Sequence, residues 1–148
     1  MSEFVLSIVV KGPGTEPKHR SHWALAIHRR NDQRGVLLHV SLIDLSRLIY
    51  QFDMRRDVLL RSRSSEGSFI VAALAHSNVR RAAELISEEP TPRDGVERCQ
   101  DWVLRAVISL EAEEIVPPGT SDWVSGLVGQ SADSVAQAVS ARWSSTDA

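Results

Sequence analysis

Residues 22–28 read HWALAIH, and this segment decides the fold class. Large apolar residues alternate with small or polar ones, which is the two-residue period of a β-strand. Both histidines share one face with the two alanines, while the tryptophan, leucine and isoleucine share the other. Because alanine is small, we expect a helix backbone to approach the histidine face closely.

Strand-like segments lie on both sides of this heptapeptide. Asn31–Gly35 is rich in turn-forming residues and predicts a hairpin between residues 22–28 and the next strand. The other expected strands are Phe4–Val10, Val36–Leu42, Ile49–Met54, Val58–Arg63 and Phe69–Ala75.

The second half of the chain has helical periodicity. Asn78 is a suitable N-cap for a helix over residues 79–89, which Pro90 and Pro92 end. A second helix carries apolar residues at helical spacing, namely Val96, Cys99, Trp102, Val103, Ala106, Val107 and Leu110.

The start of this second helix has two candidates. Asp94 and Glu97 match the D-x-x-E pattern of a capping box, whereas a start nearer Arg98 places Cys99 in the first helical turn. The choice matters because the N-terminus of a helix carries a partial positive charge that stabilises a thiolate.

Two more helices are expected to begin at Ser121 and Ser131, and residues 144–148 are expected to be a flexible tail. Strands followed by helices indicate an α+β fold, an antiparallel sheet packed by helices on one face. A chain of 148 residues is long enough for one domain with a substantial core, which we place at residues 1–143.

Composition narrows the class of protein. Apolar residues make up 43% and charged residues 24%, which excludes a disordered or collagen-like chain and indicates a soluble domain. No apolar run reaches the ~20 residues of a membrane span, and MSEFVLSIVVKG at the N-terminus is typical of a first strand rather than a signal peptide. A single cysteine excludes an internal disulfide and favours the cytoplasm. The oligomeric state is left open.

Charge is unevenly distributed. Residues 18–63 carry ten Lys/Arg against four Asp/Glu, but the net charge of the chain is −2, which argues against a nucleic-acid partner. The arginines of one possible basic surface are Arg55, Arg56, Arg61, Arg63, Arg80 and Arg81. They form either a solvated face or a clamp for an anionic substrate or partner.

Three residues can carry chemistry: His22, His39 and Cys99. If the predicted hairpin forms, the two imidazoles are neighbours across it. A thiol on the apolar stripe of a helix that faces this sheet then has the arrangement of a Cys–His nucleophile. Each residue alone also has a structural explanation: the cysteine as core packing and the histidines as polar residues of a strand.

Zinc binding is an alternative role for His19, His22, His28 and Cys99. The spacing His19-x-x-His22 lacks a second ligand pair, and the chain has no second cysteine. We therefore expect no metal and no other cofactor.

The order of these residues resembles that of the circularly permuted NlpC/P60 group of papain-like proteins, which includes the lecithin:retinol acyltransferase-like enzymes. The histidines lie in HWALAI and VLLHV, and the cysteine lies in RCQDWV, which is similar to the NCEHFV motif of the acyltransferases. The resemblance covers residues 22–103. The HWAL…CQDWV pattern also looks like that of small uncharacterised fungal proteins.

The resemblance implies a soluble thiol hydrolase or acyltransferase that acts on amide, isopeptide or ester bonds of a small-molecule, peptide or protein substrate. Cys99 would be the nucleophile, His22 the base and His39 the orienting residue. Trp23, Trp102 and Arg98 would contact the substrate.

The sequence departs from the family pattern in two ways, and these bear on which substrate it takes and on whether it is active. Arg98 and Asp101 replace the Asn and His of the acyltransferase motif, and no hydrophobic anchor follows. The alternative is an inactive binding module of the same fold, which holds an anionic partner through the arginine surface or the cleft.

Overall fold

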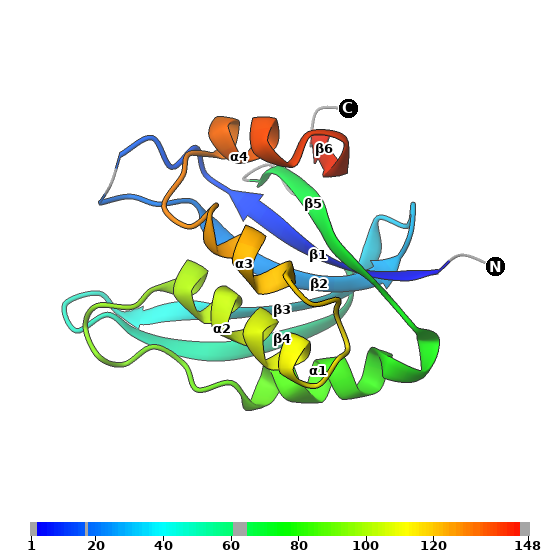
Figure 1. Cartoon of the computed structure of the whole chain (residues 1–148). Helices are drawn as coiled ribbons and strands as arrows, with labels where there is room; N and C mark the ends of the chain where they lie inside the picture. The colour runs from blue at the N-terminus through cyan, green and yellow to red at the C-terminus, as the bar shows by residue number, and fades with distance from the viewer. Residues whose placement is uncertain (1–2, 17, 61–64, 146–148) are drawn as a thin grey trace.

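The computed structural model describes residues 3–16, 18–60 and 65–145, and it confirms the α+β class. One antiparallel sheet has the strand order β4-β3-β2-β1-β5-β6 (Figure 1). Its strands are β1 (Phe4–Lys11), β2 (His22–Arg29), β3 (Arg34–Asp44), β4 (Ile49–Leu59), β5 (Ser65–Leu74) and β6 (Trp143–Ser145). The helices are α1 (Val79–Glu88), α2 (Cys99–Ala112), α3 (Thr120–Ser125) and α4 (Ala132–Val139), with short 3-10 turns at His76–Asn78 and Ser140–Arg142.

The helices pack on the face of the sheet that carries the large apolar side chains. Trp23, Leu25 and Ile27 of β2 belong to the same core as Trp102 and Val103 of α2. Figure 1 shows α1, α2 and α3 on one side of the strands.

The opposite face of β2 carries His22, Ala24 and Ala26. The two alanines lie in a small separate cluster with Val9 and Leu37, and in the described part of the chain this cluster contains no helical residue. We call this side the helix-free face. The expectation that a helix approaches the histidine face is therefore wrong. Burying Trp, Leu and Ile removes far more apolar area from water than burying Ala, so the helices pack against the bulkier set.

Strand β4 is continuous where two short strands were expected. Its register against β3 shifts between Gly35 and Leu37, and Asp57 has a φ of +50°. Such a β-bulge locally breaks the alternation of side chains, which is why the sequence resembles two separate strands. Residues 61–63 of the second expected strand lie outside the described residues.

Helix α2 begins at Cys99, so the later of the two candidate starts is correct. The Asp94 carboxylate accepts the backbone N–H groups of Val96 and Glu97 in a turn that precedes the helix. The N-cap is instead Arg98, and Oδ2 of Asp101, three residues later, accepts the backbone N–H of Arg98 at 2.9 Å. Cys99 is thereby the first residue of the helix.

The C-terminal region is more ordered than expected. Ser131 caps α4 by accepting the backbone N–H of Ser134, as predicted. Ser144 and Ser145, the first residues of the expected tail, instead pair with β5 as part of the edge strand β6. This pairing needs a glycine at position 67, because a Cβ there would collide with the Trp143 ring. Residues 146–148 of the expected tail lie outside the described residues.

Within the described ranges, no helix is both long enough and apolar enough to cross a membrane.

Candidate functional site

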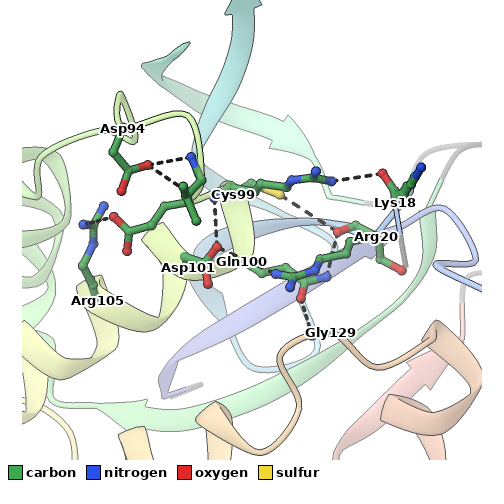
Figure 2. Close-up of polar contacts among 12 residues, drawn as sticks. Lys18, Arg20, Asp94, Cys99, Gln100, Asp101, Arg105 and Gly129 are labelled. Atoms are coloured by element: carbon green, nitrogen blue, oxygen red, sulfur yellow. Dashed lines mark hydrogen bonds and ion pairs between the residues drawn. The ribbon is translucent and has the colours of Figure 1, made fainter. Parts of the chain in front are cut away.

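Cys99 lies at the junction of α2 with the start of β2. Its side chain is 7% exposed, and its Sγ lies 4.0 Å from the carbonyl oxygen of Ser21 (Figure 2). Burial raises the pKa of the Cys99 thiol, although nearby backbone N–H groups, including that of Trp23, favour the thiolate. The helix start that stabilises a thiolate is present, but desolvation outweighs it.

His22 and His39 come together on the helix-free face. The Nε2 atom of His22 lies 3.4 Å from Nδ1 of His39, and the two rings meet edge to face with centroids 5.6 Å apart. The sequence predicted this pairing across the hairpin. Lys11 lies directly opposite His22 on β1.

Asp53 extends the pair into a chain of three side chains. It is the direct partner of His39 across β3 and β4, and its Oδ2 lies 3.2 Å from His39 Nε2. A carboxylate accepts hydrogen bonds, so His39 Nε2 carries a proton and Nδ1 of the neutral ring accepts one from His22 Nε2. Asp53 thus fixes the tautomer of His39, and through it that of His22.

Both imidazoles are neutral at neutral pH. Burial, followed by the charges of His39 and Lys11, lowers the pKa of His22 to about 4. Burial also lowers the pKa of His39, against the opposing effect of the Asp53 hydrogen bond and charge. The pKa of the Asp53 carboxyl is lowered, chiefly by its hydrogen bond from Arg55, whose Nε lies 2.9 Å from Oδ2.

The structure does not bring Cys99 to the two histidines. Cys99 belongs to the core on the helix side of the sheet, together with Trp23. His22 is adjacent to Trp23 in the strand, so its side chain points to the opposite face. The sulfur therefore lies against the backbone on one side of β2, and the imidazole lies on the other.

The three residues expected to contact a substrate have structural contacts instead. Trp23 and Trp102 are fully buried in the core, where packing on the large apolar face of β2 leaves neither at a cleft. Arg98 donates from Nη1 to the carbonyl oxygen of Lys18 at 3.0 Å, which attaches the loop before β2 to the start of α2.

Gln100 joins three segments at this junction and was not singled out from the sequence. It is fully buried, donates from Nε2 to the Ser21 carbonyl at 2.9 Å, and accepts the backbone N–H of Gly129 at 2.8 Å (Figure 2). The sequence feature that could have identified it is a glutamine within the apolar stripe of a predicted helix. Lys11 and Asp53 were also missed, because their positions depend on strand register.

Of the arginines expected to form a basic surface, three that the structure describes are paired with carboxylates. Arg80 and Arg81 on α1 both pair with Glu84, while Arg55 on β4 pairs with Asp53. Arg61 and Arg63 lie outside the described residues. Arg20 pairs with Asp101.

The residues weighed as zinc ligands are also apart. Cys99 lies on the helix side of the sheet, and the side chain of His28 bonds to Ser7 on β1. Among the described residues, no group of three His, Cys, Asp or Glu is placed to hold a metal ion.

Comparison with known proteins gives a family but no activity. A model of a family of unknown function, DUF6540, matches residues 8–117, a range that includes His22, His39, Asp53 and Cys99. No curated protein matches the chain, and no solved structure does.

Proposed function

Because the chain belongs to DUF6540, a family of unknown function, its activity has to be argued from its own side chains, and we propose that it is a binding module for an anionic partner. The ligand is held by the histidine cluster on the helix-free face, formed by Lys11, His22, His39, Asp53 and Arg55. In this function the architecture is still permuted papain-like, but the Cys99 thiol has no catalytic role.

The observation that carries this proposal is the position of Cys99 across the sheet from both imidazoles. A thiol and its base must be within hydrogen-bond reach, about 2.6–3.2 Å, for the base to take the thiol proton. The Sγ atom of Cys99 instead lies 4.0 Å from the carbonyl oxygen of Ser21. His22 contacts His39, and His39 contacts Asp53, but the nucleophile that these orienting contacts would serve is on the other side of the sheet.

The charges of the histidine cluster favour an anion. Lys11 and Arg55 are cationic and Asp53 is anionic, while both histidines are neutral near pH 7. An anion that lies over Lys11 and His22 stabilises the protonated form of His22 and raises its pKa from about 4. Binding therefore takes up a proton, and the affinity rises as the pH falls.

Inorganic phosphate is a suitable probe for this cluster. We expect phosphate to shift the imidazole NMR resonances of His22 and His39 and to bind more tightly at pH 5.5 than at pH 7.5. Lys11→Gln should weaken binding several-fold, whereas Lys18→Gln, which changes an exposed lysine in the preceding loop, should not. Equal affinity of the two variants, or no shift at either ring, overturns the proposal.

A thiol hydrolase or acyltransferase is the second candidate function. The observation that favours it is the place of Cys99 as the first residue of α2, at the positive end of the helix dipole. Catalysis by this thiol requires the start of β2 to rotate so that His22 reaches the helix side of the sheet.

A thiol-directed vinyl sulfone separates the two candidates. Labelling of Cys99 that disappears in His22→Gln supports the hydrolase and contradicts the binding module. Labelling that is absent, or unchanged by His22→Gln, removes His22 from the role of base.

A further inference from the structure

Ser7 and His28 form a second polar pair on the helix-free face. Ser7 lies on β1 and is 2% exposed, and its Oγ is 2.8 Å from Nε2 of His28 on the neighbouring strand β2. The pair is distinct from the histidine cluster, because His22 and His28 lie at opposite ends of β2.

The tautomer of His28 is determined by the backbone. Its Nδ1 lies 2.9 Å from the carbonyl oxygen of Arg29, and a carbonyl only accepts hydrogen bonds. Nδ1 therefore carries a proton, and the lone pair of the neutral ring is on Nε2, where it accepts the hydroxyl proton of Ser7. This is the order of a nucleophile, a base and an orienting group.

Both residues line a cavity of about 430 Å³. This volume lies near the lower end of the range for ligand pockets, so it suits a small molecule. Arg30 and Arg142 are part of the wall, and Arg142 is held in place by donating to the carbonyls of Ile70 and Val71. Arg30 is paired with Glu3, so the guanidinium group of Arg142 is the positive charge at the wall that favours negative charge on a reacting oxygen.

We propose that Ser7 and His28 form a hydrolytic site for small esters. Ser7 Oγ bonds to the acyl carbon while its proton passes to Nε2 of His28. The bond from the acyl carbon to the alcohol oxygen then breaks, and this oxygen takes the proton from Nε2.

Water completes the reaction. It attacks the acyl carbon and gives a proton to Nε2, the bond between Oγ and the acyl carbon breaks, and the proton returns to Oγ. The products are the carboxylic acid and the alcohol, and the protein is regenerated.

A small alkyl fluorophosphonate tests the nucleophile in the unmodified chain. We expect one adduct per chain, with loss of fluoride, on the peptide that contains Ser7. This measurement needs no variant, so it holds even if Ser7→Ala fails to fold. An adduct only on other residues, or none, overturns the proposal.

Hydrolysis of p-nitrophenyl acetate tests the base. His28→Gln should lower the rate at least tenfold, in keeping with the roughly 10²–10⁴-fold contribution of a general base. His19→Gln, which changes an exposed imidazole outside the cavity, should retain the rate.

A different outcome is expected if the hydrogen bond between Ser7 and His28 has only a structural role. The Ser7 adduct should form more slowly in His28→Gln than in the unmodified chain, because no base takes the hydroxyl proton. A folded His28→Gln variant that retains the rate of hydrolysis and of adduct formation overturns the proposal.

Discussion

The Nε2 atom of His22 and the Nδ1 atom of His39 lie 3.4 Å apart on the face of the sheet that no described helix covers. The two residues come from neighbouring strands of one hairpin. Asp53, on the next strand, fixes the tautomer of His39 and, through it, that of His22. His22 and Cys99 do not form a thiol site, because strand β2 lies between the imidazole of His22 and the sulfur of Cys99.

Cys99 should react slowly with electrophiles in the native protein. Burial raises the pKa of its thiol, and each unit lowers the thiolate fraction about tenfold. Iodoacetamide at pH 7 should label the native chain at least about tenfold more slowly than the chain unfolded in guanidinium. Comparable rates in the two states, or rapid native labelling at pH 6, contradict this assignment.

His22 should make the native state less stable in acid. Its pKa is about 4 in the folded protein and about 6.5 in the unfolded chain, so the unfolded chain binds more protons between these values. The free energy of unfolding should therefore fall as the pH falls from about 6.5 to about 4, by roughly 3 kcal/mol in all.

Urea titrations at pH 7.5 and pH 4.5 measure this loss. His22→Gln should reduce the difference in unfolding free energy between the two pH values, and His19→Gln, at an exposed position, should leave it unchanged. An identical pH dependence in His22→Gln and the wild type contradicts the low pKa of His22.

Gln100→Ala should destabilise the protein by roughly 2–3 kcal/mol, because it leaves the buried Ser21 carbonyl and the Gly129 N–H without their partner. Gln51→Ala, at an exposed position on β4, should change the free energy of unfolding by less than about 0.5 kcal/mol. Equal urea midpoints for the two variants indicate that Gln100 does not join these segments.

Gly67→Ala should detach β6 from β5. Its Cβ would meet the Trp143 ring and, at 2.6 Å, the Ser144 carbonyl oxygen, and overpacking of this kind costs about 1–3 kcal/mol. Gly126→Ala is the matched control, since a Cβ there meets only a carbonyl oxygen at 3.5 Å. A thermal midpoint of Gly67→Ala as high as that of Gly126→Ala is incompatible with the described pairing of β6.

Local patterns in the sequence were sufficient for much of the architecture. The turn at Asn31–Gly35 predicted the hairpin that pairs His22 with His39, and Ser131 predicted the cap of α4. These features depend on residues close together in the chain, so their physical causes are readable from composition and spacing.

The bulge at Asp57 and the edge strand β6 were not readable in this way. A bulge depends on the register of β4 against β3, and β6 depends on a glycine in β5 about 76 residues earlier in the chain. Asp53 and Lys11 were missed as neighbours of the histidines for the same reason.

The sequence by itself determined that Trp23 and His22 lie on opposite faces of one strand, because the side chains of a strand alternate. Only the tertiary structure decided which face the Cys99 helix covers. That choice depends on the apolar area that the whole sheet and helix layer bury together, and the large side chains of β2 outweighed the space left by its alanines.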